Sequence, residues 1–361
     1  MTTRSLFLSS SVGHAHRAAS RAIAAALDPG WQHEELDYLA FLSRLERHVW
    51  TGLYHALLAY APGVWRAWRQ LTDRPGEPRF LRERVADAGA RGLAAVFDRV
   101  QPRFVASTVS GAASLASAAR RQLGARFVNA LVVTHFRAHR HWARPGVDIA
   151  FVATDEARAD LIRHGLAADR IVVAGTPLRP NIRPVDAHER RAIRASVGCG
   201  DDPMVVLSTG GTGVYRARTR VLDRLAGLGR PLDVLMFAER GTLETRGPVR
   251  IHRLGFRDDF GRLLAAADAC VGKLGSLTAA EACAVGTPIV VYEPIPGPEE
   301  ANAAHLVAIG AARWPRTLDE LGRSVTRVLD GDGERLARAG RAMQRPDAAR
   351  AIASQLQELA C

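Results

Sequence analysis

The sequence has little lysine, little cysteine and no long apolar run. Only Lys273 is a lysine among 49 basic residues, so arginine carries almost all of the formal charge of +12. The four cysteines show no Cys-x-x-Cys spacing, which argues against a disulfide framework or a cysteine-based zinc site. No segment approaches the roughly 20 apolar residues of a membrane-spanning helix, and the first residues lack the apolar core of a secretion signal. We therefore expect a reduced, cytoplasmic protein.

The positive charge does not by itself indicate nucleic-acid binding. The arginines are distributed along the whole chain, and no basic motif with interleaved aromatic residues accompanies them. We expect no nucleic-acid partner, whereas an anionic membrane surface remains compatible with this charge.

Short β-branched runs alternate with Ala-, Arg- and Leu-rich helical segments, a pattern typical of parallel α/β sheets. The expected strands are residues 6–9, 104–107, 127–133, 149–153 and 171–173 in the first half, and 204–207, 233–237, 249–253, 269–271 and 289–292 in the second. The pattern restarts after Pro177, Pro180 and Pro184, which break helical structure. We predict two doubly wound domains, residues 1–178 and 179–345, facing each other across a cleft. A last helix, residues 346–361, is expected to pack back on the first domain.

Glycine-rich turns follow several strands of the second half. One strand runs into Gly210, Gly211, Thr212 and Gly213. Glycines let backbone amides approach a diphosphate, and a helix N-terminus adds positive potential, although such turns are also common without a ligand. Further segments that combine a turn with polar residues are expected at residues 255–259, 267–282, 286–289 and 297–302. Because the carboxyl ends of parallel strands meet at one edge, these turns predict one ligand site.

Two charged residues stand out in this group. Gly275 and Ser276 would begin a helix with Thr278 and Glu281 in its first turns, where a carboxylate can bind a ribose diol or simply offset the helix dipole. Lys273 stands at a strand end facing the predicted site. Either a compact ammonium is required where a guanidinium would not fit, or the single lysine is placed there by chance.

Histidines mark two loops of the first half. Gly13, His14, Ala15 and His16 join the first strand to the first helix. A helix N-terminus disfavours the imidazolium, so His14 or His16 would stay neutral and accept a proton, unless it only caps the helix or faces solvent.

A second histidine group, His135, His139 and His141, follows a later strand. His135 and His139 could share a helical face and bind a metal, but no acidic residue or cysteine adjoins them, and we expect no metal site. The segment Asp330-Gly331-Asp332 resembles a metal-binding Asp-x-Asp motif, and we interpret it as a turn between helices.

Residues 41–97 interrupt the alternation with consecutive helices that are rich in arginine and aromatic residues. Aromatic rings favour the lipid headgroup boundary, and arginines are attracted to anionic lipid. We predict that Trp50, Tyr54, Trp65 and Trp68 contact a membrane. The alternative is that these rings pack within the first domain.

Together these motifs resemble glycosyltransferase family 28, and particularly its monogalactosyl- and glucosyl-diacylglycerol synthases. The family's loop Gly-x-Gly-His-x-x-Ala corresponds to residues 13–19, and its Thr-Asp-Phe element with later His and Trp corresponds to residues 134–142. Its series Lys-x-Gly-Gly-x-Thr, Glu-Ala, Gly-x-Pro and Gly-Gln-Glu, with a later Asn, corresponds to residues 273–302. The chain departs from these patterns at Ala15, His135, Ser276 and Pro298.

The resemblance implies the GT-B fold, two Rossmann-like domains that bind the acceptor (N-terminal) and the nucleotide-sugar donor (C-terminal). It implies His16 as the base, with His135 and His139 as alternatives, and Gly13, His14 and Ala15 as the acceptor loop. The residues implied to bind the donor are Gly210, Gly211, Thr212, Gly213, Phe256, Arg257, Lys273, Gly275, Ser276, Thr278, Glu281, Glu299 and Asn302. Among these, Glu281 would hold the ribose, and Glu299 with Asn302 the sugar.

The implied function is inverting transfer of a hexose from a UDP-sugar to a diacylglycerol-type lipid hydroxyl, without metal or other cofactor. The protein would then lie on the inner face of the cell membrane. Alternatives are a transferase for an undecaprenyl-linked precursor or small secondary metabolite, a UDP-sugar epimerase, and a non-catalytic nucleotide-sugar binding protein.

Overall fold

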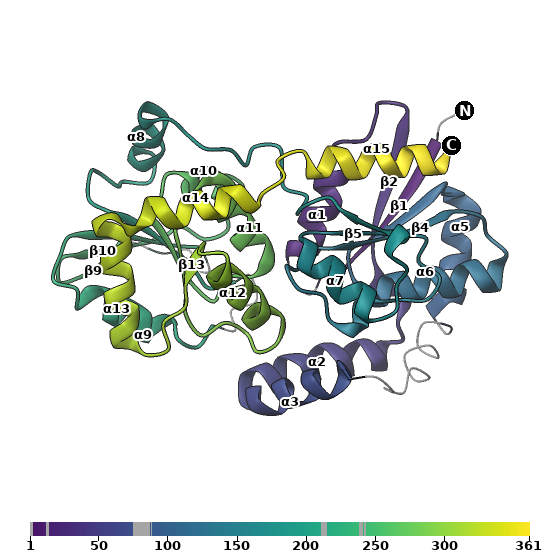
Figure 1. Ribbon diagram of the computed structural model, residues 1–361, viewed down its shortest axis with the longest axis horizontal. Helices are drawn as coiled ribbons and strands as arrows, with labels where there is room; N and C mark the ends of the chain where they lie inside the picture. Colours follow the sequence, from purple (N-terminus) through teal and green to yellow (C-terminus); the bar gives the residue numbers. More distant parts are fainter. Residues whose placement is uncertain are drawn as a thin grey trace. The chain divides into compact units, whose positions relative to one another are not determined.

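The chain forms two structural units, each built on its own β-sheet (Figure 1). The computed structural model describes residues 3–11, 14–74, 87, 89–210, 215–237, 241 and 243–361, without the side chains of residues 14, 49–51, 55 and 59. The first unit comprises Met1–Arg179 with Arg345–Cys361, and the second comprises Pro180–Gln344. The expected boundaries, after residues 178 and 345, lie within one residue of these.

The first sheet has six parallel strands in the order β2-β1-β3-β4-β5-β6. They are β1 Thr3–Ser9, β2 Trp31–Asp37, β3 Phe104–Ser107, β4 Val128–Val133, β5 Ile149–Val152 and β6 Ile171–Val173. Successive side chains of a strand point to opposite faces. Phe7 of β1 therefore packs with Phe104 on one face, while its neighbours Leu6 and Leu8 pack on the other.

Helices cover both faces of the first sheet, as a parallel sheet requires. They are α1 His14–Ala24, α5 Ala94–Val100, α6 Ser110–Leu123, α7 Asp155–Arg163 and α15 Ala348–Ala360, with short 3-10 turns η1 Tyr38–Phe41, η2 Arg91–Leu93, η3 Arg140–Trp142 and η4 Ala168–Arg170. The last helix, α15, lies beside α1 (Figure 1). Its Ile352 and Leu356 are fully buried with Phe7 and Ile23 in one core cluster, so the end of the chain completes the core of the first unit.

Helices α2 (Arg44–Tyr60) and α3 (Pro62–Thr72) form a helical hairpin. Ser43 and Glu46 exchange side-chain and backbone hydrogen bonds at the start of α2, a capping box. Pro62 stands in the first turn of α3, where its missing N–H is not needed. The sequence therefore specifies both helix starts and the sharp turn between them at Ala61.

The second sheet has seven strands in the order β13-β12-β11-β7-β8-β10-β9, parallel except for β9. They are β7 Met204–Ser208, β8 Leu232–Met236, β9 Glu244–Arg246, β10 Val249–Arg253, β11 Ala269–Gly272, β12 Ile289–Val291 and β13 Ala312–Arg313. The helices are α8 Ala187–Ala195, α9 Arg218–Ala226, α10 Phe260–Ala265, α11 Ser276–Val285, α12 Pro298–Ala308, α13 Leu318–Arg327 and α14 Gly333–Met343, with a π-helical turn at Val328–Asp332. The order in which the chain adds strands reverses between β7 and β11. Ligands commonly bind at the carboxyl edge of a parallel sheet at such a point.

The segment Asp330-Gly331-Asp332 lies in the π-helical turn between α13 and α14. Asp330 pairs with Arg230 at 2.7 Å, and Asp332 forms an ion pair with Arg313. The two carboxylates thus bind arginines, in agreement with the interpretation of this segment as a turn.

Candidate functional site

Three neighbouring strands of the second sheet, β12, β11 and β7, carry the predicted polar turns at their carboxyl ends. Gly210 follows β7, Lys273 follows β11, and Glu299 lies in α12 after β12. The structure brings these three residues together, because Lys273 contacts both of the others. Gly211, Thr212 and Gly213, which were predicted to bind the diphosphate, lie outside the described residues.

Lys273 is buried against Gly210, the residue that follows β7 by two positions. An added Cβ at Gly210 (φ +72°) would lie 2.2 Å from Lys273 Cε, so no larger residue fits above the lysine. At Gly272 (φ +132°) an added Cβ would lie 2.2 Å from the carbonyl oxygen of Ser208. These two glycines let the ends of β7 and β11 approach closely with the lysine between them.

Glu299 has a partner on each carboxylate oxygen. Lys273 Nζ donates to Oε1 at 2.6 Å, and the backbone N–H of Ile295 donates to Oε2 at 2.8 Å. The side chains of the lysine and the glutamate are 7% and 9% exposed. The buried ion pair therefore fixes the direction of the carboxylate at the start of α12.

Helix α11 presents its N-terminus at the same edge of the sheet. Gly275 precedes its first residue, Ser276, which is buried, and Thr278 is half-buried in the first turn. Glu281 follows in the second turn and is 2% exposed. Burial, and secondarily the charge of Glu281, raise the pKa of the Cys270 thiol on β11. The carboxylate predicted to hold the ribose thus lies against the sheet.

The other predicted donor residues differ in exposure. Phe256, after β10, is 73% exposed, whereas Asn302 in α12 is buried. Arg257 donates two hydrogen bonds of 2.7 Å to Asp259, so its side chain belongs to its own loop.

In the first unit, His16 lies in the first turn of α1. Burial lowers its pKa to about 4, against a smaller opposing effect of a hydrogen bond with the Thr108 backbone. Its Nδ1 atom is buried and has no hydrogen-bond partner among the described residues. The imidazole is therefore neutral near pH 7, with a ring nitrogen available for proton exchange. Of the predicted acceptor loop, Ala15 is half-buried, Gly13 is outside the described residues, and the side chain of His14 is not described.

His135 follows β4 and is electrostatically coupled to His16. Burial, and secondarily the nearby His16 and Arg69, lower its pKa to about 3. Its ring also lies 6.0 Å from that of the buried Trp142, measured between centroids. Two neutral imidazoles, one at the start of α1 and one after β4, thus interact electrostatically near the carboxyl edge of the first sheet.

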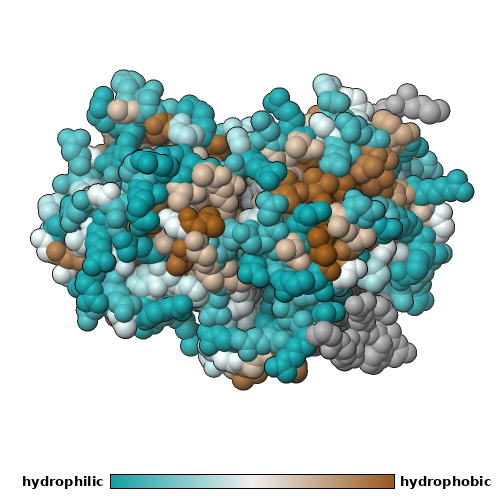
Figure 2. Space-filling view, in the orientation of Figure 1, coloured by the Kyte–Doolittle hydropathy of each residue, from teal (hydrophilic) through white to brown (hydrophobic). Residues whose placement is uncertain are grey.

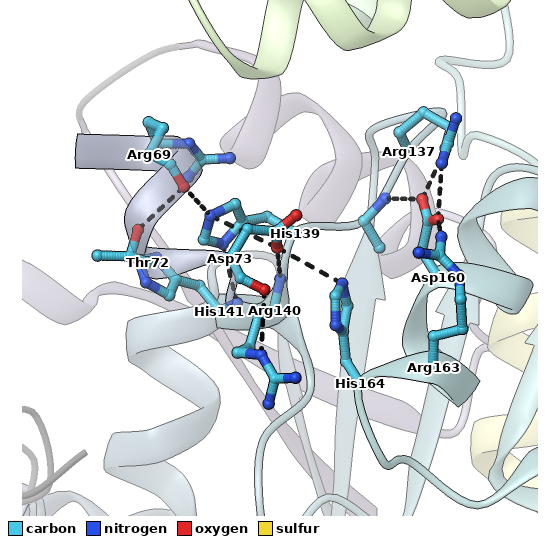
Figure 3. A network of polar contacts seen from close by, with 11 residues as sticks. Arg69, Thr72, Asp73, Arg137, His139, Arg140, His141, Asp160, Arg163 and His164 are labelled. Atoms are coloured by element: carbon cyan, nitrogen blue, oxygen red, sulfur yellow. Dashed lines mark hydrogen bonds and ion pairs between the residues drawn. The ribbon is translucent and has the colours of Figure 1, made fainter. Parts of the chain in front are cut away.

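Both ring nitrogens of His139 are engaged (Figure 3). The backbone N–H of His141 donates to Nδ1 at 3.1 Å, so Nε2 carries the proton and donates to the carbonyl oxygen of Arg69 at 2.9 Å. A histidine held in this way has no nitrogen left to accept a proton. The geometry therefore argues against the predicted role of His139 as a base and gives it a structural role.

His139 belongs to a group that joins α3 to the loop after β4, which we name the Asp73 cluster and define as Arg69, Asp73, His139, Arg140 and His164 (Figure 3). Asp73 Oδ1 accepts from the Arg140 backbone at 2.8 Å and lies 3.6 Å from His139 Nε2 and 3.5 Å from His164 Nε2. The cluster fixes the end of the hairpin beside the loop that carries His135.

The aromatic residues of the hairpin pack mainly on one another. Trp65 contacts Tyr54 and stacks on Trp68 with ring centroids 5.3 and 5.1 Å apart, and Trp68 lies 5.9 Å from His141. Tyr54 and Trp65 are half-buried and Trp68 is 37% exposed, while the side chain of Trp50 is not described. The predicted set of membrane-contact residues is thus partly internal to the hairpin.

Aliphatic residues, one tyrosine and the exposed part of Trp68 form the apolar surface of the hairpin. The residues concerned are Leu45, Leu53 and Tyr60 on α2, and Val64, Trp68 and Leu71 on α3. Their spacing of three, four, seven or eight residues places each set on one side of its helix. Figure 2 shows hydrophobic atoms among polar ones at the lower edge of the view, where Figure 1 shows the hairpin. Within the described part of the chain, no helix is long and apolar enough to cross a membrane.

One group of potential metal ligands, which the sequence analysis missed, forms in the second unit. Asp233 accepts a 2.7 Å hydrogen bond from His252 Nε2, and Cys199 Sγ lies 3.6 Å from the same nitrogen. Arg250 also donates to both oxygens of Asp233, and burial raises the pKa of the Cys199 thiol to about 12. A protonated thiol and a carboxylate already bound by a guanidinium make this a hydrogen-bonded core cluster. Its members are far apart in sequence, so no local motif could have indicated it.

The two units, each with a parallel sheet covered by helices, define the class of protein: the chain has the GT-B glycosyltransferase fold. A solved structure of MurG from Acinetobacter baumannii matches with a TM-score of 0.64 and 16% identity, covering 99% of each chain. UDP-GlcNAc 2-epimerase from Neisseria meningitidis matches with a TM-score of 0.62 and 11% identity, covering 99% of this chain and all of the other. At these identities the likeness shows the fold alone, and it leaves transferases and epimerases equally possible.

Sequence comparisons are more specific. Residues 16–178 match the monogalactosyldiacylglycerol (MGDG) synthase family. A processive diacylglycerol β-glucosyltransferase from Bacillus pumilus is 26% identical over 213 residues, 57% of this chain and 55% of the relative. The protein of the same name from Bacillus subtilis is 25% identical over 252 residues, 67% and 64% of the two chains. The matched part thus spans less than two thirds of these relatives. These findings confirm the resemblance to glycosyltransferase family 28 and its diacylglycerol glycosyltransferases.

Proposed function

We propose that the chain is an inverting, metal-independent glycosyltransferase that moves a hexose from a UDP-sugar to the hydroxyl of a diacylglycerol-type lipid. The names of its sequence relatives support the lipid acceptor and the hexose. The fold, with polar turns on three adjacent strand ends of the second unit, supports a nucleotide-sugar donor.

The observation that carries the proposal is the state of His16. Its pKa of about 4 keeps the ring neutral, and Nδ1 is unengaged within the described residues. As the base, His16 would remove the proton of the acceptor hydroxyl while the oxygen attacks the anomeric carbon from the face opposite the leaving UDP. One such displacement inverts the configuration at that carbon. The adjacent His135, also neutral, adds no positive charge that would oppose protonation of His16.

The leaving diphosphate would be stabilised by the protein itself. The N-termini of α11 and α12 lie after β11 and β12, beside the glycine turn that follows β7. Helix N-termini and glycine-turn amides stabilise anionic oxygens without a metal ion. Lys273 Nζ is hydrogen-bonded to Glu299, so we assign the stabilisation of the diphosphate charge mainly to backbone dipoles.

The hairpin α2–α3 supports an acceptor that is drawn from a membrane. Residues 41–74 contain five arginines against two acidic residues, and their exposed apolar side chains lie on both helices. Arginines near an anionic surface contribute about 1 kcal/mol each, and exposed apolar side chains insert at the headgroup boundary. We therefore propose that the hairpin docks on anionic lipid at the inner face of the cell membrane.

Release of free UDP tests the proposed reaction. The protein should be incubated with UDP-glucose, UDP-galactose and UDP-N-acetylglucosamine in EDTA, with and without vesicles that contain diacylglycerol. We expect UDP release from a UDP-hexose only when diacylglycerol is present. An epimerase would convert the sugar without an acceptor, and a binding protein would release no UDP, so either result would refute the proposal.

A further inference from the structure

The buried pair Lys273–Glu299 connects two parts of the proposed donor site. The lysine stem supports Gly210 in the turn after β7, and its ammonium holds Glu299 at the start of α12. Each side chain is less than a tenth exposed. A single side chain thus links the turn expected at the diphosphate with the carboxylate expected at the sugar.

Glu299 keeps hydrogen-bonding capacity despite its two partners. A carboxylate offers about four acceptor positions, and Lys273 and the Ile295 N–H occupy one on each oxygen. Gly275 borders Oε1, and even an added Cβ there would be 3.7 Å away. The carboxylate can therefore accept hydrogen bonds from hydroxyl groups, but only from the directions that its two partners leave open.

We propose that Lys273 is a positioning residue that selects the donor hexose by fixing the direction of the Glu299 carboxylate. This inference rests on the proposed function. Epimeric hexoses such as glucose and galactose differ in the direction of one hydroxyl group, so a fixed carboxylate discriminates between them and a rotating one does not. The preceding Pro298 has no polar side-chain atom with which to make this contact.

The geometry also explains why this position holds the only lysine of the chain. Gly210 lies against Cε and Glu299 against Nζ, so the space suits a compact ammonium. A planar guanidinium is larger and would have to displace the turn or rotate the carboxylate.

The test compares the affinities for UDP, UDP-glucose and UDP-galactose by calorimetry in wild type, Lys273→Met and Lys273→Met/Glu299→Gln. Methionine keeps an unbranched stem under Gly210 and removes only the ammonium. We expect wild type to prefer one UDP-hexose by about tenfold or more, and Lys273→Met to bind both within about threefold of each other. UDP affinity should stay within about threefold of wild type. The matched control is Arg230→Met, which removes a cation from the exposed pair with Asp330.

The double variant addresses stability, since Lys273→Met leaves a buried carboxylate without its cation. It should regain the thermal midpoint without regaining the preference between the sugars. The inference would be overturned if Lys273→Met kept the wild-type preference, or if it bound UDP and both UDP-sugars more weakly by the same factor. It would also be overturned if wild type bound both UDP-sugars with equal affinity. A wild type that binds no UDP would instead refute the proposed function.

Discussion

Among the single residues, His16 and His139 illustrate how environment separates two histidines that are alike in sequence context. Burial lowers the pKa of each to about 4. His139 uses both ring nitrogens to tie the loop after β4 to α3, whereas Nδ1 of His16 is unengaged within the described structure. The sequence motifs and the family resemblance made both candidate bases, because a one-dimensional pattern does not record which nitrogens are already bound.

Replacement of His16 by alanine should abolish transfer with little effect on the donor. General base catalysis contributes about 10²- to 10⁴-fold, so we expect kcat to fall by at least about 100-fold. UDP affinity, measured by calorimetry, should change by less than about twofold, because the residue belongs to the first unit. The exposed His188→Ala serves as the matched control. Activity above about a tenth of wild type would transfer the role to His135.

The pH profile gives an independent test of the same residue. Because its pKa is lowered to about 4, His16 stays neutral as the pH falls, and kcat/KM should be nearly constant from pH 7.5 to 5.5. A histidine with the ordinary pKa near 6.5 would lose about tenfold over this range. An apparent pKa near 6.5 in the acidic limb would contradict the assignment.

Stability must be monitored over the same range. Folding lowers the pKa values of His16 and His135, so below pH 6.5 the unfolded state binds more protons. The free energy of unfolding therefore falls as the pH drops toward 4. Circular dichroism at each pH shows where the rates still refer to folded protein.

At the scale of elements, the hairpin α2–α3 has two faces with different roles. Its inner rings, Tyr54, Trp65 and Trp68, hold the helices together, and the Asp73 cluster fixes the end of α3 to the first unit. On the other face Tyr60, Val64 and Leu71 are each at least 60% exposed, so they bury little area in the fold. Changes to the two faces should therefore separate membrane binding from stability.

The triple variant Tyr60→Ser/Val64→Ser/Leu71→Ser replaces side chains that are each at least 60% exposed. We expect it to lose most flotation with phosphatidylglycerol vesicles, while its thermal midpoint stays within about 2 °C of wild type. Wild-type binding should weaken as salt rises. In contrast, Trp65→Ala removes a packed ring and should cost up to about 3 kcal/mol. The control Leu123→Ser/Leu359→Ser, elsewhere in the same unit, should float like wild type, and equal binding by the triple variant would exclude docking by this face.

Most of the interior elements followed from the sequence, while three strands did not. β-Branched and apolar runs indicated the ten strands from β1 to β12 other than β2 and β9. The missed strands β2, β9 and β13 all lie at sheet edges. Strand β2 carries the polar sequence Gln32, His33, Glu34 and Glu35, and β13 has two residues. An edge strand is held by one neighbour and faces solvent, so it needs no apolar run.

The part of the site that lies at the ends of strands could be predicted from the sequence. Gly210, Lys273 and Glu299 meet because β7, β11 and β12 are neighbours in the sheet. In contrast, the Asp73 cluster and the group of Cys199, Asp233 and His252 join residues far apart in sequence. Their side chains meet only through tertiary packing, which no local pattern encodes.

For the whole molecule, two units with separate cores carry two separate sets of polar groups. The first has two neutral histidines at its strand edge and an arginine-rich apolar hairpin, and the second has a buried ion pair between a glycine turn and a helix N-terminus. The first set suits a lipid hydroxyl, and the second suits a nucleotide sugar. The central claim is that the chain joins these two substrates by a single displacement.

Analysis of the lipid product tests this claim most directly. The protein should be incubated in EDTA with α-linked UDP-glucose or UDP-galactose and diacylglycerol vesicles, and the lipid extract examined by mass spectrometry and by NMR of the anomeric proton. We predict a hexosyl-diacylglycerol with the β configuration, formed by wild type and not by His16→Ala. A product that retains the α configuration, or no glycolipid from protein that binds UDP and floats with the vesicles, would contradict the account.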